Sequence, residues 1–158
     1  MTVRPFVVAP ENYAPALDIV GEHVTVLASG EATESYEIFL QQGPEGSGPP
    51  PHSHPWDESF LVVKGQIDFG FGDESKTASP GTLVHLPAGT VHWFRFGSGG
   101  AEMVSITSRL GASKMFTDIC ARSRTGEPRR RKARSRRRPA WAEGRGLTVR
   151  LLPARAAR

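Results

Sequence analysis

The chain has 158 residues, 38% of them hydrophobic and 23% charged, with a formal net charge of +4. This length allows one core and hardly two, and no apolar run approaches the roughly 18 residues of a membrane span. The N-terminus is too short and too interrupted in its apolar character for a signal peptide, and the single cysteine, Cys120, excludes an intrachain disulfide. We therefore expect one domain in the cytoplasm.

The charge is divided unevenly along the chain. Residues 1–120 carry 6 Lys and Arg against 14 Asp and Glu, a balance of −8, whereas residues 121–158 carry 14 against 2, a balance of +12. We therefore expect N-terminal strands and a loop over 1–34, an acidic core over 35–120, and an Arg-rich, disordered tail over 121–158.

Short strands separated by Gly and Pro turns are the dominant pattern. In chain order we expect a strand over 4–8, loop over 9–19, a strand over 23–27, a turn at 29–31, a strand over 35–42 and loop over 43–51. Further short strands follow at 52–54, 59–64, 66–71, 82–86, 91–96 and 102–107, with hairpin-like breaks at 64–66 and 72–74 and a short helix over 113–119. This spacing predicts an all-β antiparallel sandwich or barrel.

One segment combines two histidines with a glutamate. It reads G-x5-H-x-H-x3-E-x6-G from Gly46 to Gly65, with His52, His54 and Glu58 at the named positions. In a strand, residues two apart face the same side, so both imidazoles point together. The proline after the second histidine predicts a turn, and an antiparallel return would let Glu58 face the two rings.

A second segment supplies a third imidazole. It reads G-x5-P-x-G-x2-H from Gly81 to His92, and a spacer of 15 residues separates Gly65 from Gly81. Three neutral imidazoles and a carboxylate suit one divalent ion of Fe, Mn, Ni, Cu or Zn, and ligand type alone does not choose among them. We predict His52, His54, Glu58 and His92 as ligands of this metal.

Parity along the strands predicts the walls around this centre. If His92 faces inward, Phe94 and Phe96 do so too, and an inward Glu58 places Phe60 inward. These three phenylalanines are our candidates for contact with a substrate, although packing in the core accounts for them equally well. The remaining histidines are less informative: we expect a structural role for His85 and none in function for His23.

The two motifs resemble those of the cupin superfamily, over residues 35–106. The resemblance implies a double-stranded β-helix, or jelly-roll barrel, and the small single-domain group that is similar to quercetin-dioxygenase-like proteins (the Cupin_2 type) is the best match. The second motif often ends in H-x3-N, but position 96 is Phe in this chain. The asparagine is not a metal ligand in that pattern, so the change implies only a more apolar pocket floor.

The resemblance implies a metal-dependent dioxygenase acting on a small aromatic or enol-type molecule. Glu58 would then be the labile ligand and the general base. Two alternatives remain open: a metal-dependent isomerase or hydro-lyase, and a cupin that binds a small ligand without catalysis. Four ligands around tetrahedral zinc would instead close the site and make it structural. The resemblance also implies a homodimer.

The tail differs from the rest of the chain. Residues 129–138 include eight Lys and Arg, a run that could bind nucleic acid through phosphates or dock on an acidic surface. Trp141 is the only aromatic residue of the tail, so the tail lacks the series of aromatic side chains on which bases would stack. Of residues 121–158, 26 are Arg, Ala, Pro or Gly, which is typical of a shifted reading frame in a GC-rich gene. We favour this last interpretation over nucleic-acid binding.

Overall fold

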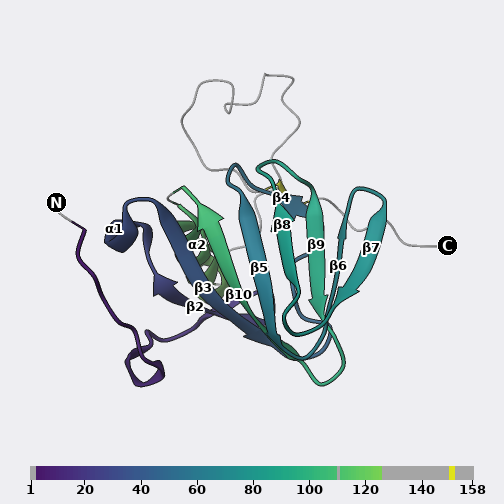
Figure 1. The fold of residues 1–158 in the computed structure, drawn as a ribbon, viewed down its shortest axis with the longest axis horizontal. Helices are drawn as coiled ribbons and strands as arrows, with labels where there is room; N and C mark the ends of the chain where they lie inside the picture. Colours follow the sequence, from purple (N-terminus) through teal and green to yellow (C-terminus); the bar gives the residue numbers. More distant parts are fainter. Residues whose placement is uncertain (1–2, 110, 126–149, 152–158) are drawn as a thin grey trace.

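Two antiparallel β-sheets face each other in the computed structural model, which describes residues 3–109, 111–125 and 150–151 (Figure 1). Sheet A has the strand order β1 (Leu17–Ile19), β2 (Glu22–Ala28), β3 (Tyr36–Gly43), β10 (Ala101–Ser108), β5 (Glu58–Lys64) and β8 (Leu83–Leu86). Sheet B has the order β11 (Arg150–Leu151), β4 (His52–Ser53), β9 (His92–Phe96), β6 (Ile67–Phe71) and β7 (Glu74–Ala78). From β3 onward the chain crosses repeatedly between the sheets, and the two facing antiparallel sheets confirm the predicted all-β jelly roll.

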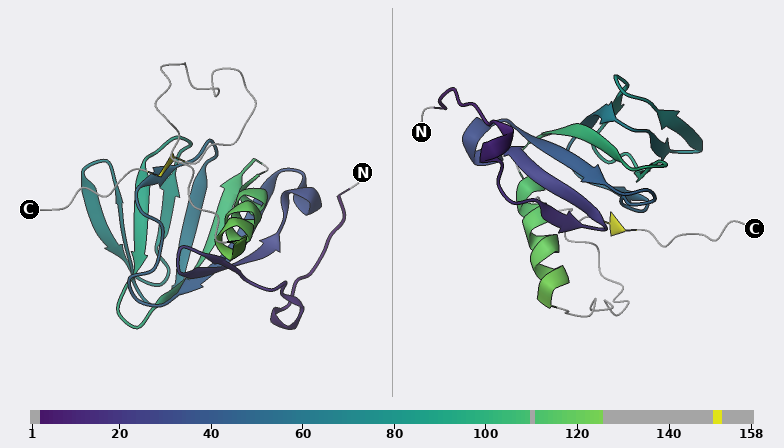
Figure 2. Two further views of the ribbon diagram at one scale, coloured as in Figure 1. Left: turned by 180° about the vertical axis from the view of Figure 1, so that it is seen from behind. Right: turned by 90° about the horizontal axis from the view of Figure 1, so that it is seen from below.

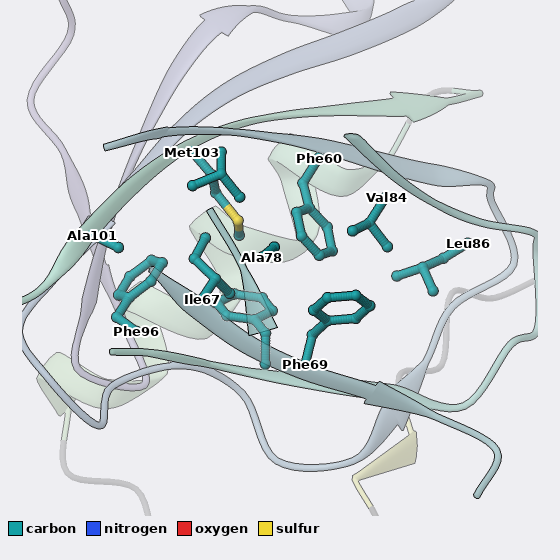
Figure 3. Packing of buried hydrophobic residues seen from close by; sticks show 11 residues of the cluster. Phe60, Ile67, Phe69, Ala78, Val84, Leu86, Phe96, Ala101 and Met103 are labelled. Carbon is teal, nitrogen blue, oxygen red and sulfur yellow. The ribbon is translucent and has the colours of Figure 1, made fainter. Parts of the chain in front are cut away.

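The main core fills the space between the two sheets. Its buried side chains alternate with exposed ones along each strand, as the two-residue period of a strand requires. Phe60 and Phe69 pack edge to face with ring centroids 5.8 Å apart. Burial of one such side chain stabilises the fold by about 1.5–3 kcal/mol. The cluster, seen in Figure 3, comprises Phe60, Val62, Ile67, Phe69, Ala78, Val84, Leu86, Phe94, Phe96, Ala101 and Met103.

A second core lies under helix α2 (Ala112–Thr125), which covers the part of sheet A that sheet B leaves open (Figure 2). Its buried members are Ile19, Val24, Phe39, Trp56, Ala112 and Cys120, with Met115, Phe116 and Ile119 of the helix packed against them. Phe39 and Phe116 meet edge to face at 5.1 Å. The predicted helix is therefore confirmed, and its apolar side chains cover this face of the barrel.

One buried carboxylate holds the start of α2. Glu37 on β3 accepts hydrogen bonds from the backbone N–H groups of Gly111, Ala112 and Ser113 at 3.1, 2.6 and 3.2 Å. Its second oxygen accepts from the N–H of Gly30, at the start of α1 (Gly30–Thr33), at 3.1 Å. Although burial opposes ionisation of Glu37, the hydrogen bond from the Ser113 hydroxyl and those from the N–H groups of Gly111, Ser113 and Gly30 outweigh it and lower the pKa. A negative charge at a helix N-terminus is also favoured by the helix dipole.

Backbone conformation and space explain why glycine occupies position 65, at the end of the first motif. Its φ of +74° lies in the left-handed region, and a Cβ atom there would stand 2.3 Å from the carbonyl oxygen of Gly100. The tight turn between β5 and β6 therefore requires glycine.

Several predicted elements differ from those in the structure. Residues 4–8 form no strand, because Pro5 has no N–H for a ladder and no strand of the described residues pairs with this segment. The turn at 29–31 is the start of α1, with Ser29 as its N-cap. The polar strand β7 was not predicted, since its hydroxyl and charged side chains are mostly exposed and show no apolar alternation.

The predicted division at residue 120 falls within α2, which continues to Thr125. The tail prediction concerns mostly 126–149 and 152–158, which lie outside the described residues. In the described part of the chain, no helix is long and apolar enough to span a membrane.

Candidate metal centre

Sheet B brings two of the predicted ligands face to face. His52 on β4 and His92 on β9 are directly paired in the antiparallel register, and their ring centroids lie 4.3 Å apart. His54 follows β4 by one residue, and its ring lies 5.0 Å from that of His92. One ring nitrogen from each histidine lies within 4.8 Å of the other two. The three predicted imidazoles thus converge.

All three rings are oriented in the same way by the backbone. In each, Nδ1 lies at hydrogen-bond distance from a backbone carbonyl oxygen two residues away, and a carbonyl oxygen can only accept a hydrogen bond. Nδ1 therefore carries the hydrogen, and the neutral ring presents the Nε2 lone pair. The carbonyl partners of His52, His54 and His92 are Pro50 at 2.9 Å, Trp56 at 2.8 Å and Thr90 at 2.9 Å.

Glu58, at the start of β5, brings its carboxylate to two of these nitrogens. Its Oε2 lies 3.0 Å from Nε2 of His54 and 3.4 Å from Nε2 of His92. All three side chains are almost fully buried, and Nε2 of His92 has no hydrogen-bond partner of good geometry. The three histidine nitrogens all lie within 4.8 Å of one another, but Glu58 does not belong to this group. Its carboxylate therefore approaches the histidines from the side of His54 and His92.

These contacts need a positive charge between them. With hydrogen on Nδ1, Nε2 of His54 and Nε2 of His92 each direct a lone pair toward Oε2 of Glu58, which is repulsive unless a proton or a metal ion lies between them. Two donors that are each about 2.1 Å from one ion lie about 3.0 Å apart at 90° and about 3.4 Å apart at the tetrahedral angle. The separations from Glu58 to His54 and His92 fall at these values, so the donor set fits a divalent metal ion.

The electrostatics keep the donors in the states that bind metal. Burial alone would raise the pKa of Glu58, but hydrogen bonds and positive charge at His54 and His92 lower it to about 2, so the ionised carboxylate depends on a positive charge between these groups. Burial, reinforced by repulsion from His92, lowers the pKa of His52 to about 4. At neutral pH the carboxyl group is therefore ionised and the His52 ring is neutral.

Trp56 belongs to this site although we did not predict it. Its ring stacks on that of His54 at 4.8 Å with only 9° between the planes, and it is buried in the core under α2. The stack and the carbonyl bond together fix the ring of His54. The position of Trp56 between His54 and Glu58 was the only sequence signal for it.

The predicted pocket residues lie directly below the centre. Phe60, Phe94 and Phe96 follow Glu58 and His92 on the inward faces of their strands, as parity predicts, and all are buried in the main core. The structure thus accounts for them as packing residues, and their contact with a substrate stays a prediction. A hollow of about 630 Å³ lies elsewhere, between residues 3–8 and the edge formed by β2, β3 and α1.

The other two histidines lie away from the centre. His85 is exposed on the outer face of sheet A, where its Nδ1 lies 2.9 Å from the hydroxyl oxygen of Ser59. His23 is exposed and lies 2.8 Å from Asp18. Neither contacts the three converging histidines.

Comparison with known proteins adds a family to this geometry. The model of the cupin domain matches residues 39–107, which include all four predicted ligands. The chain is 28% identical over 85 residues to quercetin 2,3-dioxygenase of Bacillus subtilis, which covers 53% of this chain. The match spans only 25% of that enzyme's own length.

Solved structures with the same fold include two bacterial proteins. The structure of KdgF from Halomonas sp. superposes with a TM-score of 0.64 at 17% identity, over 70% of this chain and 99% of that one. The polyketide cyclase RemF from Streptomyces resistomycificus gives a TM-score of 0.58 at 16% identity, over 66% of this chain and 80% of that one. At these identities the likeness concerns the fold.

Proposed function

The chain belongs to the cupin superfamily, and we propose that it is a metal-dependent enzyme of the dioxygenase type acting on a small aromatic or enol-type molecule. The metal is inferred from the convergence of His52, His54 and His92 and from the lone pairs of His54 and His92 that face the Glu58 carboxylate. The relative with quercetin 2,3-dioxygenase activity supports the reaction class, although this chain spans about a quarter of that enzyme's length.

Each ligand would have its own part. His52, His54 and His92, oriented by carbonyl bonds, would hold one divalent ion of Fe, Mn, Ni, Cu or Zn. Such an ion polarises a bound oxygen atom and, where it changes oxidation state, moves electrons. Glu58 approaches from one side and would leave the ion most readily, so its carboxylate would accept the proton of a substrate hydroxyl.

Two other functions use the same residues. A metal-dependent isomerase or hydro-lyase needs only the polarising effect of the ion. A small-ligand-binding cupin without catalysis would hold the ion and its ligand with no turnover. With quercetin as the first substrate, oxygen uptake separates the dioxygenase from both alternatives.

Elemental analysis of the purified protein tests the metal itself. We expect about one ion per chain, and loss of most of it in His54→Ala because one of three nitrogen ligands is removed. His85→Ala is the matched control, since it removes an exposed imidazole that contacts none of the others. No metal in the wild type, or equal metal in both variants, would contradict the proposal.

We also propose a cytoplasmic homodimer formed through the outer face of sheet A. The front of Figure 1 looks onto this face, where the described chain places no helix. It carries the exposed side chains of Leu61, Leu83 and Ile106, and an apolar face of this kind typically marks a protein contact. Leu83→Glu should shift the protein to monomers in size-exclusion chromatography with light scattering, and an unchanged mass would exclude this face.

The single buried cysteine, Cys120, supports a reducing compartment.

A further inference from the structure

Six buried polar side chains lie on sheet A outside the metal centre, among them Thr25 and Glu37. Glu22, Gln41, Ser105 and Thr107 are exposed by 3, 3, 0 and 2%, respectively, and we call them the polar strip. Strand positions inside a barrel normally hold apolar residues, as Val62 and Met103 do in the same sheet. The polar strip is therefore an exception that needs an explanation.

The register places one end of the polar strip beside the metal centre. Thr107 on β10 is the direct cross-strand partner of Glu58 on β5, so the two side chains share the inner face with Cβ atoms about 4.5–5.5 Å apart. Ser105 lies two residues along the same strand and faces the same way. The polar strip thus begins at the carboxylate that contacts His54 and His92.

The rest of the polar strip continues across β3 to β2. The side-chain amide of Gln41 donates to the hydroxyl oxygen of Ser105 at 2.6 Å. Val24 is the partner of Gln41, and Glu22 lies two residues before Val24 on the same face. Burial, followed by the charge of Glu58, raises the pKa of Glu22 to about 8, against an opposing effect of Arg95. A mostly protonated Glu22 can donate as well as accept a hydrogen bond.

Two atoms of the polar strip have no partner within the described chain. These are Oγ1 of Thr107 and Oε2 of Glu22, both inaccessible to solvent. A buried polar group without a hydrogen bond costs about 1–3 kcal/mol, and Val in place of Thr107 would avoid this cost at almost the same volume. A ligand held at the metal centre that bonds to Oγ1 of Thr107 would remove the cost at that atom.

We propose that Thr107, at the end of the polar strip beside Glu58, binds a hydroxyl group of a ligand that is held at the metal centre, so that the site selects hydroxylated ligands over their methyl analogues. A hydroxyl group matches because it donates and accepts, as does the unpartnered hydroxyl of Thr107. The apolar rings of Phe60 and Phe94 would contact the rest of the ligand. This inference rests on the proposed metal centre and adds which ligands that centre would prefer.

A pair of small metal-binding pyranones tests the inference. Kojic acid and allomaltol both present adjacent enol and ketone oxygens to a metal, and differ only in a hydroxymethyl group where allomaltol has a methyl group. Calorimetric titration of the purified, metal-containing protein should show kojic acid binding at least about fivefold more tightly, as expected for one buried hydrogen bond. In Thr107→Val, the two affinities should become equal.

Three further variants keep the test decisive. Thr107→Ser retains the hydroxyl and should retain the preference, and Ser105→Ala should reduce it if Thr107→Val fails to fold. Thr77→Val, on the exposed side of β7 and away from the centre, should leave the ratio unchanged.

The two proposals fail in different ways. Equal affinities in the wild type, as expected if only water occupies the polar strip, would overturn the inference and leave the metal centre standing. A preference that persists in both Thr107→Val and Ser105→Ala would also overturn it. A protein that contains no metal and binds neither compound overturns the proposed function and this inference together.

Discussion

Strands β5 and β9 each change chemical character along their length. Each begins with a polar site residue, Glu58 or His92, and continues on the same face with a phenylalanine, Phe60 or Phe94. All four side chains are exposed by 7% or less, so burial is not what separates the two ends. The difference lies in partners: the apolar end is stable because water is excluded, whereas the metal end needs a cation to compensate its lone pairs and charge.

The apolar end should show the largest effect of a single substitution. Phe96→Ala removes a side chain that is 1% exposed in the main core, and we expect a loss of about 3–5 kcal/mol in the free energy of unfolding. Urea denaturation followed by circular dichroism measures it. A loss below about 1 kcal/mol would mean that this end is not a packed core.

The metal end should respond instead to its ion. A metal at 100 times its dissociation constant should stabilise the folded protein by about 2.7 kcal/mol, and a chelator should remove this gain. Differential scanning calorimetry with and without EDTA measures the shift in Tm. His54→Ala should abolish the response while His85→Ala retains it, and an equal response in both variants would contradict the comparison.

Glu37 is a buried carboxylate whose partners are already present, so it contrasts with Glu58. Its folded-state pKa is lowered, so its contribution to stability is fully present above the ordinary glutamate pKa and is lost as the pH falls through the lowered value. We expect Glu37→Gln to cost about 1–3 kcal/mol at pH 7 and less at pH 3. Urea unfolding of the wild type and the variant between pH 3 and pH 7 measures the difference in their free energies of unfolding. A difference that does not change with pH would contradict the prediction.

Exposed polar pairs on sheet A should matter least. His85→Ala breaks only the contact with Ser59, and we expect a change within about 0.5 kcal/mol in the free energy of unfolding. A larger effect in the same urea assay would indicate that the outer face is covered in solution, in agreement with a dimer through this face.

The positions of the short strands follow from the sequence because alternation and turns are local properties. The strand predicted over 59–64 and the one over 91–96 correspond to β5 and β9 within a residue or two, and parity correctly placed Phe60 and Phe94 inward. Residues 4–8 were predicted wrongly, since an apolar composition does not supply a pairing partner. β7 was not predicted because it forms a strand by pairing with β6, and its own side chains show no strand pattern.

The sequence by itself determined that three histidines and a glutamate occur at spacings that bring them together, because strand alternation and motif glycines act over a few residues. Only the tertiary structure decided that Trp56 stacks on His54, that carbonyl groups orient His52, His54 and His92, and that Thr107 stands beside Glu58. The first two relations join residues only two apart, but they depend on the backbone conformation that sheet pairing and packing impose. The third joins strands that are far apart in the chain and depends on sheet register, for which no short stretch of sequence contains the information.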